Sequence, residues 1–91
     1  MNDDFRYLDD LTEETRAMII NDVSAGKKNL YHSVMACLQN RINSKNFTRN
    51  DEAEADFYIA KHKIPPDRQG NIRELVYLCY KRLWERGYIQ N

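Results

Sequence analysis

A chain of 91 residues is long enough for one hydrophobic core and too short for two. Its 42% apolar and 31% charged residues, with a net charge of zero, exclude wholesale disorder. Three glycines and two prolines are too few for a loop-rich or all-β domain, and two cysteines do not make a disulfide scaffold. We therefore expect a single helical domain over residues 1–91, in which residues 1–9 form a flexible or docked arm.

The first two predicted helices span residues 10–25 and 29–44. Asp10 and Asn29 are the expected N-caps, and Gly26 ends the first helix. Apolar residues at helical spacing predict the two buried faces. These faces are Leu11, Thr15, Met18, Ile19 and Val23 in the first helix and Leu30, Tyr31, Val34, Met35, Cys37, Leu38 and Ile42 in the second.

The third predicted helix spans residues 48–64, with Thr48 as its N-cap. Pro65 and Pro66 end it, because the residue before a proline is disfavoured in α geometry. Its acidic first half suits the helix dipole, so we interpret these acids as a solvated surface and not as catalytic carboxylates. The acids are Asp51, Glu52, Glu54 and Asp56. The expected buried face is Ala53, Phe57, Ala60 and Ile64.

The fourth predicted helix, residues 71–87, has the most apolar surface. Asn71 and Glu74 form an expected capping box, and Gly87 closes the helix. The expected core stripe is Ile72, Leu75, Val76, Cys79 and Leu83. A second stripe at the same spacing, the aromatic stripe, consists of Tyr77, Tyr80 and Trp84. It is either further core or a partly exposed partner site, since tyrosine and tryptophan are favoured interface anchors.

Four amphipathic segments joined by short connections predict an all-α fold, a small antiparallel bundle of about four helices. No apolar run reaches the ~20 residues that cross a membrane. The first residues also lack the basic and apolar regions of a signal peptide. We therefore expect a cytoplasmic protein with no membrane partner.

The ending RLWERGYI, residues 82–89, resembles the end of the recognition helix and the first wing strand of winged-helix DNA-binding domains. Residues 53–70 would then supply the preceding helix and turn. The resemblance covers about a third of the chain, contains no diagnostic motif and includes no second wing strand. It therefore implies at most a plain helix-turn-helix variant.

Charge is distributed unevenly along the chain. Residues 1–22 carry seven acids and two bases, whereas residues 61–91 carry seven bases and three acids. One interpretation is that these two parts pack against each other. The other is that they form two surfaces of opposite sign, one for a basic partner and one for an acidic partner or nucleic acid.

No arrangement of residues in the chain predicts catalysis or metal binding. The candidate ligands His32, Cys37, His62 and Cys79 lack zinc-site spacing, and no glycine-rich phosphate loop is present. Both cysteines occupy apolar helix positions, where buried free thiols are expected. We therefore expect no enzymatic activity, no metal and no cofactor.

The favoured hypothesis is a non-catalytic helical module that binds another protein. It would act as a regulator, inhibitor or immunity-type factor of a bacterium or mobile element. The hypothesis rests on the lack of site chemistry and on the aromatic stripe of the fourth helix. The expected partner-binding residues are Arg73, Tyr77, Tyr80, Arg82, Trp84 and Arg86.

The alternative is a DNA-binding regulator of helix-turn-helix type that uses the basic carboxy-terminal third. Basic residues beside aromatic ones bind phosphates and stack on bases. The sequence pI of about 6.7, however, lacks the basic excess typical of such domains. The additional nucleic-acid contacts would be Lys61, Lys63, Arg68 and Lys81. A homodimer is compatible with either hypothesis, because a shared interface stabilises a small domain.

Overall fold

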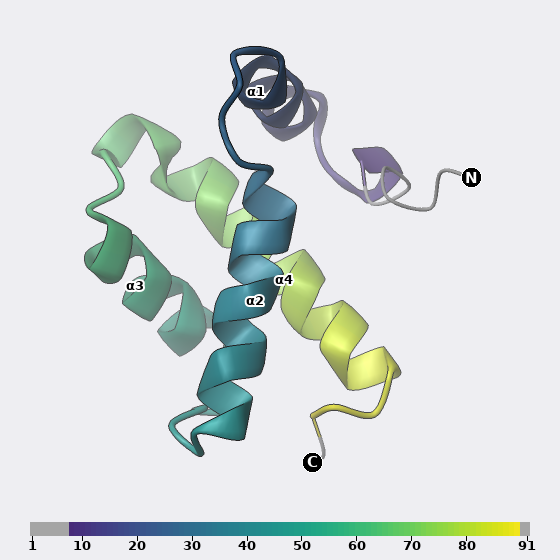
Figure 1. Ribbon diagram of the computed structural model, residues 1–91, viewed down its shortest axis with the longest axis vertical. Coiled ribbons are helices and arrows are strands. Elements are labelled where there is room, and N and C mark those ends of the chain that lie inside the picture. Colours follow the sequence, from purple (N-terminus) through teal and green to yellow (C-terminus); the bar gives the residue numbers. More distant parts are fainter. Residues whose placement is uncertain (1–7, 90–91) are drawn as a thin grey trace.

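The computed structural model describes residues 8–89 and contains four helices within them. The helices are α1 (Glu13–Ser24), α2 (Leu30–Asn43), α3 (Asp51–His62) and α4 (Pro66–Glu85). No strand occurs in residues 8–89, and the predicted all-α bundle is confirmed. Figure 1 shows α2 crossing in front of α4, with α3 to one side and α1, seen nearly end-on, above them. Of the predicted arm, residues 1–7 lie outside the described part, and a short 3₁₀ turn covers residues 8–10.

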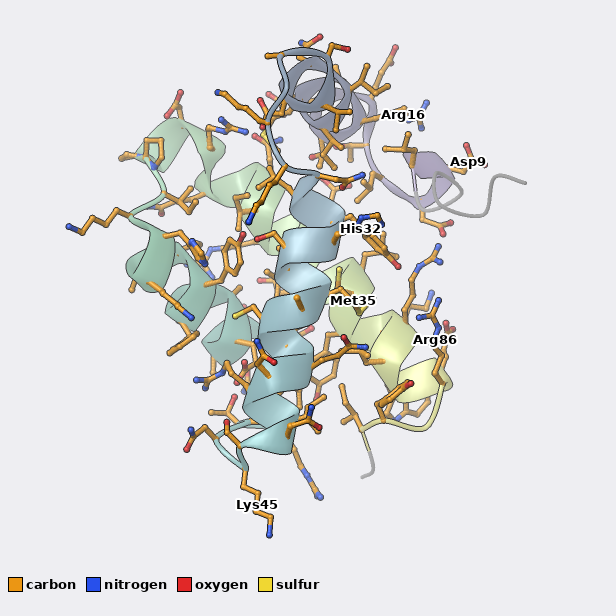
Figure 2. The ribbon with its side chains drawn as sticks, viewed as in Figure 1. Asp9, Arg16, His32, Met35, Lys45 and Arg86 are labelled. Carbon is orange, nitrogen blue, oxygen red and sulfur yellow. The ribbon has the colours of Figure 1, made fainter. Side chains whose placement is uncertain are left out.

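Helix α4 lies at the centre of the fold, because each of the other three helices packs against it. Its predicted core stripe is confirmed, since all five side chains are at most 1% exposed. Met35 projects from α2 towards α4 and is buried there (Figure 2). Burial of one aliphatic side chain stabilises a fold by about 1.5–3 kcal/mol, so this stripe is a major source of stability.

Helix α4 begins at Pro66, so the predicted N-cap Asn71 is wrong. Proline suits the first position of a helix, because an N–H at that position has no intrahelical partner. Gly70 and Asn71 therefore lie inside the helix, although neither residue favours a helix interior. Contacts with α1 stabilise this early start, since Arg68 pairs with Asp22 at 2.7 Å.

Glu74 caps α1 and not its own helix. Its carboxylate accepts the backbone N–H of Thr12 at 2.6 Å and the hydroxyl groups of Thr12 and Thr15 at 2.9 and 2.6 Å. Thr12, and not the predicted Asp10, is thus the N-cap of α1. Burial raises the pKa of Glu74, but these donors together hold the pKa below its ordinary value. Asn71 adds a hydrogen bond to Thr15 at 3.0 Å, so this polar cluster attaches α1 to α4.

Helix α3 buries a different face from the predicted one. Ala53 and Ile64 are half-buried, whereas Phe57 and Ala60 are exposed. The buried residues are Glu54, Ala55, Tyr58 and Ile59. The prediction was wrong because it placed all four carboxylates of the acidic run in solvent. Since Glu54 is buried, the face of α3 that contains Glu54 packs against the rest of the protein.

The buried carboxylate of Glu54 joins α3 to α2 and to the loop between them. Its side chain is 0% exposed and accepts two hydrogen bonds from Arg41, at 2.6 and 3.1 Å. Two more come from the N–H and the hydroxyl of Thr48, at 3.1 and 2.8 Å. Asn50 therefore caps α3, and the predicted N-cap Thr48 is wrong. Burial alone raises the pKa of Glu54, but the four donors outweigh burial and leave the pKa below its ordinary value.

The helices end in left-handed residues. Gly26 and Gly87 close α1 and α4 with φ values of 83° and 84°, as predicted. Lysines occupy the same conformation after α2 and α3, with φ of 64° at Lys45 and 51° at Lys63. Residues 86–89 form a turn and a bend, so the wing strand implied by the winged-helix resemblance is not formed.

Replacing Lys45 with glycine should raise the free energy of unfolding by about 0.5–1 kcal/mol. A side chain in the left-handed region costs roughly 1–2 kcal/mol, and the greater freedom of glycine in the unfolded chain offsets part of the gain. Figure 2 shows Lys45 extending away from the body of the protein, and it is exposed. Urea unfolding measures the change. The matched control Lys81→Gly, inside α4, should lower stability by about 1 kcal/mol. A loss of stability in both variants would contradict the conclusion that the left-handed backbone at Lys45 is strained.

Glu54→Gln should lower the free energy of unfolding at pH 7 by about 3 kcal/mol, because it leaves the guanidinium of Arg41 without its counter-charge. The folded-state pKa of Glu54 is lowered, so its contribution is present above the ordinary value of 4.5 and is lost as pH falls through the folded value. Stability of the unmodified protein should therefore fall below pH 4.5, and the variant should show a shallower fall. Chemical unfolding at several pH values checks both effects. The exposed control Glu52→Gln should leave the pH profile unchanged.

Candidate functional site

The first part of the predicted partner surface lies against α3. Arg73 pairs with Asp56 of α3 at 2.6 Å. Tyr80 stacks on Phe47, with ring centroids 5.6 Å apart and an interplanar angle of 22°. Tyr77 and Tyr80 are half-buried, so the inner part of the aromatic stripe also contributes to packing.

The outer end of the stripe faces solvent. Trp84 is 47% exposed, near the end of α4. Tyr88, three residues past that helix, is 57% exposed and is the most exposed large apolar residue in the described chain. Large apolar side chains with this exposure are candidate anchors for a partner. We refer to Trp84 and Tyr88 as the aromatic end of α4.

Sequence reasoning missed Tyr88 as a candidate site residue. Its position follows from the helix closure, because its N–H donates to the carbonyl of Leu83 at 2.9 Å and the N–H of Gly87 donates to Trp84 at 3.1 Å. Ile89, next along the chain, is buried. A glycine closure followed by one aromatic and one aliphatic residue was the available signal.

The basic residues near the aromatic end of α4 differ in whether they already form an ion pair within the fold. Arg82 pairs with Asp10 at 2.7 Å and has most of its side chain covered, so it serves the fold. Lys81 and Arg86 are exposed, and within residues 8–89 neither forms an ion pair. Figure 2 shows Arg86 at the carboxy-terminal end of α4. The aromatic end of α4 thus has two exposed cations near it that form no ion pair within residues 8–89.

The acidic and basic parts of the chain pack against each other. Asp10 pairs with Arg82 and Asp22 with Arg68, both at 2.7 Å. Each pair joins residues 1–22 to residues 61–91, which supports internal packing as an explanation of the uneven charge. Arg68, one of the predicted nucleic-acid contacts, is therefore engaged with α1.

The remaining predicted nucleic-acid contacts do not form one surface. Lys61 and Lys63 lie at the junction of α3 and α4, and Lys81 lies in the second half of α4. Figure 1 places that junction and the carboxy-terminal end of α4 on opposite sides of the molecule. A helix of 20 residues is about 30 Å long, so the lysines are too dispersed for a single contact patch.

The two histidines and Cys37 line one open groove of about 460 Å³ between α2 and α3. Burial raises the pKa of the Cys37 thiol, although the charges of Lys61 and Arg41 act in the opposite direction. The Cys79 thiol lies in the core, where burial raises its pKa to about 12. Both thiols are free, and neither environment favours the reactive thiolate.

Within residues 8–89, no group of three or more histidine, cysteine or carboxylate side chains is placed to hold a metal ion. None of the helices in that range is long and apolar enough to cross a membrane. Comparison with protein-family models, with curated proteins and with solved structures finds no match to this chain.

Proposed function

We propose that this protein is a non-catalytic helical module that binds another protein through the aromatic end of α4. The observation that supports this most directly is the exposure of Trp84 and Tyr88, at 47% and 57%. Every other phenylalanine and tyrosine within positions 8–89 is at most 36% exposed. Tyrosine and tryptophan provide much of the binding energy in protein interfaces, because they bury a large area with little loss of conformational freedom.

The surroundings of the aromatic end favour a partner with an acidic rim. Lys81 and Arg86 are exposed and carry no ion pair among the described residues, whereas Glu85 is the only acid in this stretch of the chain. Beside Tyr88, a hollow of about 260 Å³ reaches Ile42 and Gln39 of α2. A partner side chain inserted there would contact both α2 and Tyr88. The module would then act as a regulator, inhibitor or immunity-type factor.

Alanine at both Trp84 and Tyr88 should weaken partner binding at least about a hundredfold, since paired anchor residues are each worth about 2 kcal/mol or more. The tagged protein would be used to capture partners from nuclease-treated lysate, and the affinity of the purified partner would be measured by calorimetry. Stability should fall by less than for a core aromatic residue, because about half of each side chain is exposed.

Ile20→Ala provides the matched control, since Ile20 is 46% exposed on α1 and lies outside the proposed surface. It should leave partner binding within about twofold, because surface substitutions distant from an interface have small effects. Equal loss of binding in the control, or full binding by the double variant, would contradict the proposal.

The second candidate function, DNA binding, has one supporting observation. Helices α3 and α4 are separated by only residues 63–65, the turn length of a helix-turn-helix motif. Against it, α1 covers one side of the first half of α4 through Glu74 and Arg68. The first turn of α4 also carries Asp67, an exposed acid that phosphates would repel. The packing of α1 and the charge of Asp67 both disfavour insertion of the first half of α4 into a DNA groove.

Random duplex DNA should therefore show no retardation on a native gel at low salt. A protein that neutralises several phosphates binds non-specifically with micromolar affinity, and it loses that affinity steeply as salt rises. Retardation with such a salt dependence would favour the DNA-binding function over the protein-binding one. Lys61→Glu would then identify whether the end of α3 takes part.

A further inference from the structure

The groove between α2 and α3 has a chemical character that the protein-binding proposal does not use. Its lining includes two lysines, two histidines, a serine and two asparagines, and no carboxylate. These seven polar residues are Lys28, Asn29, His32, Ser33, Asn40, Lys61 and His62. Two other grooves of the molecule differ, because Asp22 lines both of them and Glu14 lines one.

Neither lysine of this groove has a counter-charge among residues 8–89. Lys28 and Lys61 are exposed, and neither forms an ion pair with any of residues 8–89. The nearby carboxylate of Glu54 is engaged by Arg41. Cys37 adds no negative charge, because burial keeps its thiol protonated. The groove therefore has a positive electrostatic potential, because no carboxylate among residues 8–89 neutralises its two lysines.

Two groups in the groove are held in place by a buried tyrosine. The ring of Tyr58 lies 4.2 Å from the ring of His62, and its hydroxyl shares a hydrogen bond of 3.0 Å with Ser33. Tyr58 is only 3% exposed, so it contacts His62 and Ser33 from a fixed position in the core. The ring of His32 packs edge-on against buried Tyr31, with 5.7 Å between ring centroids. Polar groups held in this way lose little freedom when a ligand binds.

We propose that this groove binds the phosphoryl group of a small phosphorylated ligand. Lysines serve as phosphate binders through point charge, and hydroxyl, amide and imidazole donors match the several oxygens of a phosphate. No arginine lines the groove, so a phosphoryl group there would be bound by point charges and single hydrogen bonds and not by a bidentate fork. A volume of about 460 Å³ lies within the range of small-ligand sites. The site is separate from the aromatic end of α4 and does not depend on the protein-binding function.

The test is a titration of the ¹⁵N-labelled protein with sodium pyrophosphate at low ionic strength, followed by amide chemical shifts. Shifts should concentrate in the first half of α2 and the last turn of α3. Lys28→Ala/Lys61→Ala should weaken binding at least about tenfold, because both point charges are removed. Lys45→Ala/Lys81→Ala removes the same charge elsewhere and should change the affinity by less than about twofold. All four lysines are exposed, and glutamine at positions 28 and 61 provides a second variant pair that keeps the side chains polar.

Two further ligands decide what kind of anion the groove takes. A short thymidine oligonucleotide and a polyglutamate peptide should each perturb the groove more weakly than pyrophosphate at equal charge. Absence of pyrophosphate shifts, shifts spread evenly over all lysines, or equal weakening in both double variants would overturn the proposal. Binding of the oligonucleotide or of the peptide without binding of pyrophosphate would also overturn it.

Discussion

Burial of the core stripe of α4 is the constraint on which the rest of the fold depends. Leu75, Val76, Cys79 and Leu83 are 0% exposed, although they lie on a single helix. One partner helix does not cover such a surface, so α1, α2 and α3 all pack against α4. The molecule has a flat outline, 35 × 33 × 21 Å.

Two glutamates determine how the outer helices attach to this centre. Glu74 binds the amino-terminal end of α1, and Glu54 binds Arg41 and Thr48. Apolar contacts are non-directional, whereas a buried carboxylate must have hydrogen-bond donors placed close to its oxygens. We infer that these two clusters select the positions of α1 and α3 from the several packings that apolar burial alone would permit. The guanidinium carbon of Arg41 also lies 3.7 Å from the centroid of the Phe57 ring, so a cation–π contact covers part of this exposed ring.

Some charges of the chain form ion pairs within the fold, and others form none among residues 8–89. Arg68 and Arg82 neutralise acids of the amino-terminal part. Lys28 and Lys61 remain uncompensated among residues 8–89, beside a groove without carboxylates. Trp84 and Tyr88 lie at the end of α4, away from that groove. The two proposed binding regions are therefore chemically distinct, one aromatic and one anion-attracting.

The sequence by itself determined the features that depend on residues a few positions apart. These are the four helices, the cap at Asn29, the closures at Gly26 and Gly87, and the core stripe of α4. Only the tertiary structure decided the start of α4, the buried face of α3 and the role of Glu74. The donors of Glu74 lie up to 62 residues away along the chain, and no local pattern records them. The exposure of Trp84 and Tyr88 was likewise undecided in the sequence, because helical spacing places a side chain on a face but does not say whether another helix covers it.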